Sequence, residues 1–330
     1  MSTGYYPYRN LVFEGGGVKG VAYGGAVEVL EQSRITPQIE RVAGTSAGAI
    51  TATMLSLDYK AAEFNDIMMT LPFEKLEDGS DLGGPIRLVE HYGWFKGDYF
   101  LHLMESYIEK KTTDGRATFR DLKEKYGDRG FRDLHVFGTN LSQQAVQEFS
   151  YKTTPDLAVA DAVRISMSIP LFFEARYFKQ KDGNDVYCDG GVLNNYPIGT
   201  FDDQRTDVDK ETGHTMLLRT PNRATLGFHL DNLDQPPPRP INNLRRFAVG
   251  VFDALTNIQN ILLKTNPGDE RRTVFINDLG VNTTDFQLSD QTKWNLIAQG
   301  RIATAKYLGQ PRQELAEIKR LLRRAGDSRQ

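Results

Sequence analysis

Cysteine is nearly absent from this chain, and no apolar run is long enough to cross a membrane. Cys188 is the only cysteine among 330 residues, so no intramolecular disulfide can form and a reducing compartment suits the chain. No apolar run approaches the roughly 18 residues of a membrane span, and "MSTGYYPYRN" lacks the pattern of a secretory signal. We therefore expect a cytoplasmic protein, and an effector exported by another route is compatible with the same sequence.

The chain also lacks an excess of charge of either sign. It has 40 Lys and Arg against 43 Asp and Glu, a formal charge of -3, with both signs interspersed. We therefore expect no nucleic-acid partner. The basic tail 311–330, "PRQELAEIKRLLRRAGDSRQ", is a local exception whose apolar positions share one helical face. Such a helix either makes peripheral membrane contact or packs on the domain with its arginines in water.

Strand and helix patterns alternate along the first 200 residues. "LVFEGGG" and "IERVAG" are predicted strands, and each is followed by a predicted helix. Further strands are predicted in "DLHVFGTNL", "AVQEFSY" and "DVYCDGG", while "TPDLAVADAVRISMSIP" indicates a helix that begins near Pro155. This alternation predicts an α/β fold with a mostly parallel central sheet, helices on both faces, and ligands at the carboxyl ends of strands.

The last third of the chain has a looser pattern. "FDDQRTDVDKETGH" is polar enough for an exposed loop, "INNLRRFAVGVFDALTNIQNILLK" is an amphipathic helix, "TVFIND" is a strand, and a final helix starts at Ser289 and ends before Gly309. The triple proline at 236–238 separates segments too short to fold alone. We therefore expect one domain over 1–330, completed by 201–330.

The first glycine-rich turn has two competing interpretations. Gly15, Gly17 and Gly20 satisfy the spacing of a dinucleotide fingerprint, but Glu40 precedes the second strand instead of ending it. A phosphate-binding P-loop needs Lys and Ser or Thr after the last glycine, where Val21 stands. The same turn can instead offer backbone N–H groups at a helix start to an oxyanion. A turn whose glycines only permit close packing is the structural alternative.

The second glycine-rich turn contains a candidate nucleophile. In "VAGTSAGAITA", Ser46 ends a strand and precedes a helix, with Gly44 and Gly48 on either side. This is the pattern of a nucleophile elbow, a tight turn in which the two glycines remove side chains that would collide. Two turns suited to anions on consecutive strands are unlikely to be a coincidence.

A serine nucleophile needs a base, and the histidines do not offer an obvious one. None of the five stands at a strand's carboxyl end beside small residues, so we expect no Ser–His triad. The five are His91, His102, His135, His214 and His229. Asp189 ends the strand in "DVYCDGG", and a carboxylate in a dry site can deprotonate serine directly. Asp-Gly-Gly is equally a turn capped by its aspartate, and Cys188 is expected to pack in the core.

Taken together, "EGGGVKG", "GTSAG", "RISMSIPLFF" and "DGG", in that order, resemble the patatin-like phospholipases over about residues 10–200. That family consists of serine acyl hydrolases with a Ser–Asp dyad in a three-layer α/β/α fold. By position, the resemblance implies that Ser46 is the nucleophile and Asp189 the base. It implies that the oxyanion loop contains Gly15, Gly16, Gly17 and Lys19. Glu14 departs from the aspartate that many members have, and Asp-Gly-Gly departs from the commoner Asp-Gly-Ala; neither change removes a reacting group.

The resemblance implies a lipid acyl hydrolase, of phospholipase A or lysophospholipase type, without a metal or other cofactor. Its partner would be a phospholipid or another acyl lipid, and some members require an activating partner. The alternatives are an acyltransferase or thioesterase with the same dyad, or a non-catalytic nucleotide-binding module. "SMSIPLFFEARYF" and "YGWFKGDYF" are candidates for an acyl groove, or else belong to the core.

Overall fold

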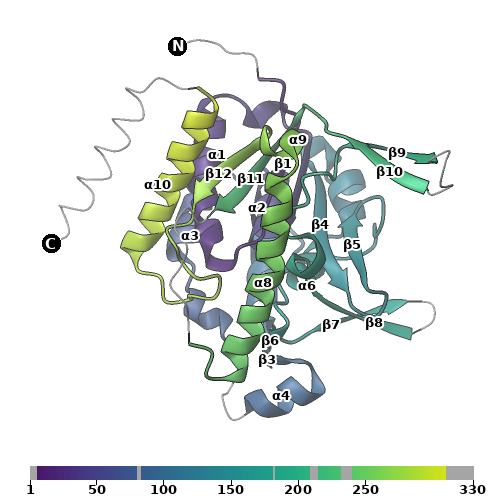
Figure 1. Cartoon of the computed structure of the whole chain (residues 1–330), viewed down its shortest axis with the longest axis vertical. Coiled ribbons are helices and arrows are strands. Elements are labelled where there is room, and N and C mark those ends of the chain that lie inside the picture. The colour runs from purple at the N-terminus through teal and green to yellow at the C-terminus, as the bar shows by residue number, and fades with distance from the viewer. Residues whose placement is uncertain (1–5, 80–82, 181–182, 209–214, 232–239, 310–330) are drawn as a thin grey trace.

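A mixed sheet of eight strands forms the centre of the molecule, in a computed structural model that describes residues 6–79, 83–180, 183–208, 215–231 and 240–309 (Figure 1). Its order is β12-β11-β1-β2-β4-β8-β7, with β5 also paired to β4. The strands are β1 (Asn10–Phe13), β2 (Arg41–Thr45), β4 (Asp133–Asn140), β5 (Ala145–Ser150), β7 (Arg176–Gln180), β8 (Gly183–Asp189), β11 (Thr225–Asp231) and β12 (Thr273–Asn277). The run from β12 to β4 is parallel, whereas β5, β7 and β8 join antiparallel.

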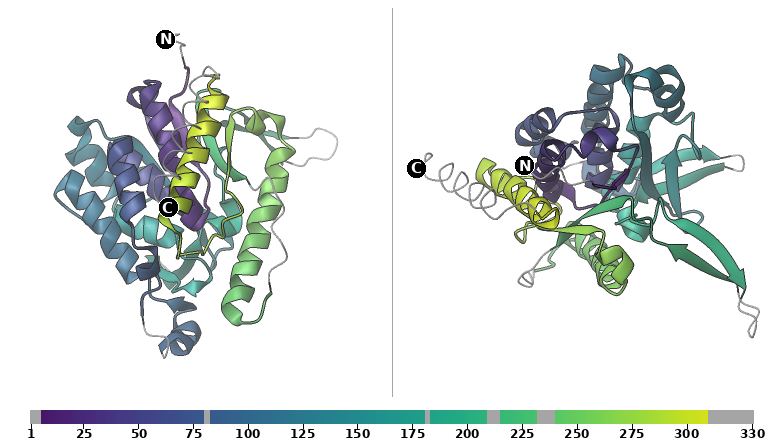
Figure 2. Two further views of the ribbon diagram at one scale, coloured as in Figure 1. Left: turned by 90° about the vertical axis from the view of Figure 1, so that its left-hand side faces the viewer. Right: turned by 90° about the horizontal axis from the view of Figure 1, so that it is seen from above.

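Helices and loops cover both faces of the sheet, as Figure 2 shows from two further sides. The helices are α1 (Tyr23–Gln32), α2 (Ala47–Ser56), α3 (Ala61–Thr70), α4 (Gly84–Glu90), α5 (Asp98–Thr112), α6 (Val159–Ser166), α7 (Gly191–Asn194), α8 (Leu244–Lys264), α9 (Pro267–Glu270) and α10 (Asp290–Tyr307). Among the helices of the described ranges, none is long and apolar enough to cross a membrane.

Alternate residues along the strands point into two different apolar layers, one on each face of the sheet. Leu11, Phe13 and Val42 point into the larger core, which contains α1, α2 and α10. Val12 and Ala43 point the other way, into a smaller cluster with Leu263 of α8. Successive strand residues face opposite sides of a sheet, so each strand serves both layers. The result is a three-layer α/β/α arrangement, as the sequence predicts.

The structure corrects three local predictions. Residues 201–214 are not only a loop: β9 (Asp203–Val208) pairs with β10 (Thr215–Thr220) in an antiparallel ribbon that projects from the body (Figures 1 and 2). Helix α6 begins at Val159 rather than near Pro155. In addition, β3 (Gly93–Phe95) pairs in parallel with β6 (Leu171–Phe173), and the sequence pattern predicts neither strand.

Other predictions of the last third have mixed outcomes. Helix α10 is capped at Ser289, whose side chain accepts a hydrogen bond from the Thr292 amide, so its predicted start is confirmed. The triple proline at 236–238 and the basic tail 311–330 lie outside the described residues.

Candidate active site

Ser46 lies in the sharp turn between β2 and α2. Its backbone has φ 52° and ψ −121°, a conformation that is uncommon for a residue with a side chain and often marks a functional turn. A Cβ on Gly44 would lie 2.2 Å from the Gly48 carbonyl oxygen, and a Cβ on Gly48 would lie 2.2 Å from the Phe13 carbonyl oxygen. Backbone therefore packs on backbone on both sides of Ser46, and only glycine fits at either position.

A serine that the sequence does not single out holds this turn in place. The Ser46 N–H donates to Ser166 Oγ at 2.8 Å, and the Ser166 hydroxyl donates to the Phe137 carbonyl at 2.5 Å. Ser166 ends α6, and Phe137 belongs to β4. The turn is thus tied through one buried hydroxyl to the neighbouring strand. Ser166 lies in the "RISMSIPLFF" segment, which is the only sequence signal that points to it.

The pairing of β4 brings Asp189 to Ser46. Strand β5 occupies one edge of β4, so β2 and β8 must share the other edge. On that edge Phe137 pairs with Thr45, and the next residue, Gly138, pairs with Asp189. Because β2 is parallel to β4 and β8 is antiparallel, the two strands run toward each other and end head to head. Ser46 directly follows β2, and Asp189 is the last residue of β8.

The Asp189 carboxyl group is completely buried. Its Oδ1 accepts a hydrogen bond from the Gly191 N–H at 2.7 Å, whereas Oδ2 has no hydrogen-bond partner in the part of the chain that the structure describes. Burial raises the pKa of Asp189 to about 7, and the Gly191 amide and the Ser46 hydroxyl lower it by smaller amounts. The carboxyl group therefore changes charge near neutral pH, next to a serine hydroxyl.

The first glycine-rich turn lies against Ser46 on another side. A Cβ on Gly15 would lie 3.2 Å from Ser46 Cβ and 2.4 Å from Asn195 Oδ1, so this close approach requires glycine. The Gly15 N–H donates to the Asn195 carbonyl at 3.0 Å and is not free. By contrast, the amides of Gly16 and Gly17 make no hydrogen bond within the described ranges. Gly16 and Gly17 are therefore the residues of the predicted oxyanion loop whose N–H groups are available as hydrogen-bond donors.

Lys19 anchors this turn to another loop. Its Nζ lies 3.0 Å from Asp278 Oδ2, and its N–H donates to the Gly16 carbonyl at 3.3 Å. The neighbouring Val18 N–H donates to the Thr283 carbonyl at 3.1 Å. The Lys19 charge is therefore paired with a carboxylate, and its side chain fixes the turn against residues 278–283.

Glu14 forms a second buried carboxyl site directly before the glycines. Its Oε1 accepts from Asn195 Nδ2 at 2.9 Å and its Oε2 accepts from the Leu230 N–H at 2.7 Å. Burial raises the pKa of Glu14 to about 8. Both oxygens have partners here, and the Glu14 carbonyl also accepts from the Tyr23 hydroxyl at 2.7 Å. These hydrogen bonds fix the position of the residue that directly precedes the glycine turn.

His229 lies two residues before the end of β11, a central strand that the sequence pattern does not predict. Its chain neighbours are Phe228 and Leu230 and not small residues. Its Nε2 lies 3.4 Å from Glu14 Oε1, and burial lowers the pKa of His229 to about 4. Its ring packs against Tyr196 and Phe275, with centroids 5.4 Å apart in both cases. His229 is therefore a neutral core residue beside Glu14.

The other histidines lie elsewhere or outside the described residues. His135 Nδ1 lies 2.8 Å from Glu148 Oε1, and His102 Nδ1 lies 2.8 Å from the Asp98 carbonyl oxygen. His214 falls in a range that the structure does not describe. Cys188 is buried beside Asp189, and burial raises the pKa of its thiol to about 12, so the thiol stays protonated.

Helix α8 covers the carboxylate side of the site. Gln259 accepts a hydrogen bond from the Asn195 N–H at 2.7 Å and donates to the Gly191 carbonyl at 2.9 Å. Phe252 lies so close to Gly191 that a Cβ there would be 2.7 Å from its ring. Under this cover Ser46 is 2% exposed and Asp189 is 0% exposed. Access to the two side chains therefore depends on α8 and its neighbours.

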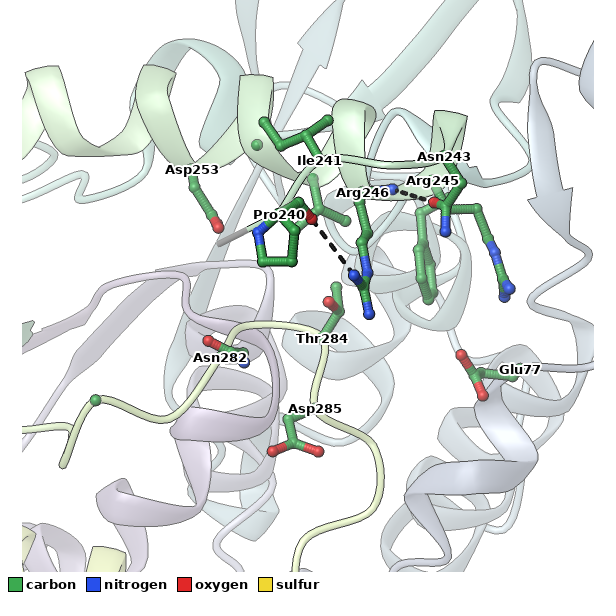
Figure 3. Close-up of a pocket in the computed structure, with 14 residues that line it drawn as sticks. Glu77, Pro240, Ile241, Asn243, Arg245, Arg246, Asp253, Asn282, Thr284 and Asp285 are labelled. Atoms are coloured by element: carbon green, nitrogen blue, oxygen red, sulfur yellow. Dashed lines mark hydrogen bonds between the residues drawn. The ribbon is translucent and has the colours of Figure 1, made fainter. Parts of the chain in front are cut away.

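A cavity of about 1030 Å³ lies beside α8 (Figure 3). Its walls come from Phe172, from α8 residues including Val249 and Asp253, and from the loop around Asn282 and Thr284. Ser46 and Asp189 do not line it. The cavity borders the glycine turn through Thr283, whose hydroxyl donates to Asp253 Oδ1 at 3.3 Å and whose carbonyl accepts from Val18.

The two aromatic segments predicted as groove candidates meet. Phe95 of β3 packs on Phe172 of β6 with ring centroids 4.9 Å apart, and Phe172 also packs on Phe286 at 5.5 Å. Phe95, Phe172 and Phe173 all belong to the buried core, and Phe172 also lines the cavity. Most of the aromatic side chains of these segments are therefore core, with one side chain at the cavity wall.

Comparison with known proteins gives the family. The patatin-like phospholipase family matches residues 11–202, more than half of the chain. The chain belongs to the patatin-like phospholipase family. It is 30% identical over 316 residues to the uncharacterized protein YqhO of Bacillus subtilis, covering 92% of this chain and 99% of that protein. It is 29% identical over 197 residues to the probable lipid hydrolase 463L of Invertebrate iridescent virus 6, covering 58% of this chain and 62% of that protein.

The fold is shared with a solved structure. VipD from Legionella pneumophila superposes with a TM-score of 0.60 at 16% sequence identity, covering 92% of this chain and 67% of that chain. At this identity the likeness concerns the fold alone. The predicted three-layer α/β/α class is confirmed, and the family membership supports lipid hydrolysis in the broad sense.

Proposed function

We propose that this chain hydrolyses the carboxylic ester bonds of phospholipids or lysophospholipids through an acyl-enzyme on Ser46, with Asp189 as general base. One observation carries the proposal: β2 and β8 end head to head on β4, with a buried serine beside a carboxyl group that has one unpartnered oxygen. A buried polar oxygen without a partner is costly, and such exceptions in native proteins concentrate at reactive sites.

In the first half of the reaction, Ser46 Oγ attacks the ester carbonyl carbon while its proton passes to Asp189. The pKa of about 7 makes the carboxylate a stronger base than an exposed aspartate and leaves it largely ionised above neutrality. The free amides of Gly16 and Gly17 would hold the negative oxygen of the tetrahedral intermediate. Each such donor is worth roughly 100 to 1,000-fold in rate. The proton then moves from Asp189 to the leaving alcohol oxygen as the C–O bond breaks.

In the second half, Asp189 takes a proton from water, which attacks the acyl carbon and releases the fatty acid. The same proton returns to Ser46 Oγ, so both groups end as they began. Gly15 has no free amide, and Lys19 is paired with Asp278, so their contribution is to shape and fix the turn. No step of this scheme requires a metal ion or another cofactor.

The test combines an active-site probe with a fluorogenic ester. We expect a fluorophosphonate probe to label the native protein but not Ser46→Ala, and ester turnover to be lost in both Ser46→Ala and Asp189→Asn. Ser56→Ala is the matched control, because Ser56 is also fully buried but donates to the Arg132 carbonyl, away from this site. Equal labelling of native protein and Ser46→Ala would contradict the proposal.

The acceptor and the lipid class need separate measurements. Lipid mass spectrometry after brief expression, native protein against Ser46→Ala, identifies the ester that is consumed. Assays with and without an added alcohol then distinguish hydrolysis from acyl transfer, and a thioester substrate tests thioesterase activity. A requirement for an activating partner stays a prediction, to be tested by adding cell lysate to an inactive preparation.

A further inference from the structure

The side chain of Gln259 on α8 joins the two ends of the short helix α7. Its Oε1 accepts a hydrogen bond from the Asn195 N–H at 2.7 Å, and its Nε2 donates to the Gly191 carbonyl at 2.9 Å. In an uninterrupted α-helix these two backbone groups, four residues apart, would bond to each other. Here one side-chain amide serves both, because an amide is at once a donor and an acceptor. With four residues, α7 is too short to be stable alone, and Gln259 supplies support from α8.

At its first residue, α7 holds the proposed general base. The Gly191 N–H donates to Asp189 Oδ1 at 2.7 Å, while the Gly191 carbonyl is the group that Gln259 binds. The fit is tight, because a Cβ on Gly191 would lie 3.0 Å from Asp189 Oδ1 and 2.7 Å from the Phe252 ring. The orientation of the Asp189 carboxyl group therefore depends on where Gln259 holds Gly191.

At its other end, α7 leads into Asn195, the residue that carries the oxyanion turn. The Asn195 carbonyl accepts from the Gly15 N–H at 3.0 Å. The Asn195 side chain donates to Glu14 Oε1 at 2.9 Å and to the Gly15 carbonyl at 3.3 Å. Asn195 thus makes three hydrogen bonds to the two residues directly before the free amides of this turn, and Gln259 binds the Asn195 N–H. One side chain of α8 is therefore linked to the base on one side and to the oxyanion donors on the other.

We propose that Gln259 is a positioning residue for ester hydrolysis, which fixes the general base relative to the oxyanion donors by bonding to both ends of α7. The inference rests on the proposed function and deepens it, because it gives α8 a part in the reaction. Proton transfer and stabilisation of the oxyanion occur in the same step, so the two groups must share one geometry, and a displacement of about 1 Å can cost roughly 100-fold in rate. Gln259 lies outside residues 11–202, the range that matches the family.

The pH dependence separates positioning from a purely structural role. Burial raises the pKa of Asp189 to about 7, and the hydrogen bond from Gly191 lowers it by a smaller amount. If Gly191 moves away, the pKa of Asp189 rises further. The groups that face this carboxyl do not titrate in the same range, since the Cys188 thiol has a pKa of about 12 and neither Ser46 nor Gln259 carries a charge. Partial unfolding, by contrast, lowers activity without moving the pH profile.

The kinetic test compares Gln259→Met with Asn257→Met on a water-soluble short-chain ester. Methionine keeps the length of the glutamine side chain and removes both hydrogen bonds, and Asn257 lies on the exposed side of the same helix. We expect Gln259→Met to lower kcat by roughly 10- to 100-fold with KM unchanged, and to move the acid limb of kcat/KM to higher pH. Asn257→Met should keep the native kcat and pH profile. A lower kcat with an unchanged pH profile would make Gln259 a structural residue and overturn the proposal.

Hydrogen–deuterium exchange gives a readout that needs no turnover. Peptides covering 11–20 and 187–196 report on the oxyanion turn and on the base. Gln259→Met should increase exchange in both peptides, and Asn257→Met in neither. Native exchange in both peptides of Gln259→Met would overturn the proposal. A native protein without Ser46-dependent turnover would contradict the proposed function, and the exchange measurement would then decide alone whether Gln259 couples the two segments.

Gln259→Glu separates the two hydrogen bonds and serves also if Gln259→Met does not fold. The carboxylate still accepts from the Asn195 N–H but cannot donate to the Gly191 carbonyl. Exchange should therefore rise in 187–196 and stay native in 11–20. Native exchange of 187–196 in this variant would show that Gly191 is held without Gln259, and the proposal would fall.

Discussion

A buried carboxyl group lies at the end of β8 and another directly after β1, but the two groups differ in their hydrogen-bond partners. Asp189 has one oxygen with a partner and one without, whereas both oxygens of Glu14 accept hydrogen bonds. Burial raises the pKa of each, to about 7 for Asp189 and about 8 for Glu14. A perturbed pKa is therefore common to both and does not identify the reactive group.

What separates the two sites is what faces each carboxyl group. The two oxygens of Glu14 accept hydrogen bonds from the Asn195 side chain and from the backbone N–H of Leu230, and the neighbouring His229 is neutral. Both oxygens are therefore engaged in structural hydrogen bonds. The free oxygen of Asp189 lies in a site that also contains a serine hydroxyl in a strained turn. An unsatisfied acceptor costs folding free energy that a satisfied one does not. We infer from this cost that Asp189, and not Glu14, is the group that transfers protons.

The largest expected effect follows from exchanging each carboxyl group for its amide. Asp189→Asn should lower kcat/KM by on the order of 10,000-fold, because an amide cannot accept the serine proton. Glu14→Gln should stay within about tenfold of native, since it keeps the size and one acceptor oxygen of the side chain. The measurement is steady-state turnover of a soluble ester at pH 8, with fold checked by circular dichroism. A larger loss for Glu14→Gln than for Asp189→Asn would reverse the assignment of roles.

The next effect concerns stability and its dependence on pH. The pKa of Asp189 in the folded state lies above its unfolded value of 3.8, so its contribution to stability is complete below that value and is lost as pH rises through about 7. Asp189→Asn has no such loss, so its stability relative to native protein should increase by about 3 kcal/mol between pH 5 and pH 8. Urea unfolding at pH 5 and pH 8 measures the difference.

Glu14→Gln provides the comparison for that experiment. Its gain should also build up as pH rises from 4.5 toward about 8, but the net gain should be smaller, because the amide leaves one of the two donors of the native site without an acceptor. Equal gains for both variants at pH 8 would mean that the open oxygen of Asp189 carries no special cost.

The contrast between the two carboxyl sites could not be obtained from the sequence, although much of the fold could. Both glycine turns and the strands that precede them are local patterns, and "DGG" shows Asp189 at a strand end. The meeting of β2 and β8 depends on which edge of β4 each strand occupies, and that pairing is set by long-range packing. The buried strand "TLGFHLD" lacks an alternating pattern and contains Gly227 and His229, so the surroundings of Glu14 were missed.

The smallest expected effect concerns Ser166, and it tests whether a hydrogen bond from the Ser46 N–H fixes the position of the nucleophile. Ser166 accepts the Ser46 N–H and donates to Phe137, so Ser166→Ala removes the acceptor that fixes the strained turn. We expect kcat to fall roughly tenfold with KM unchanged, because the nucleophile loses its position while substrate contacts remain. Ser168→Ala is the control, since Ser168 is equally buried but its hydroxyl donates to the Arg164 carbonyl. If both alanine variants lowered kcat alike, general loosening of the α6 end would explain the result, and Ser166 would have no specific positioning role.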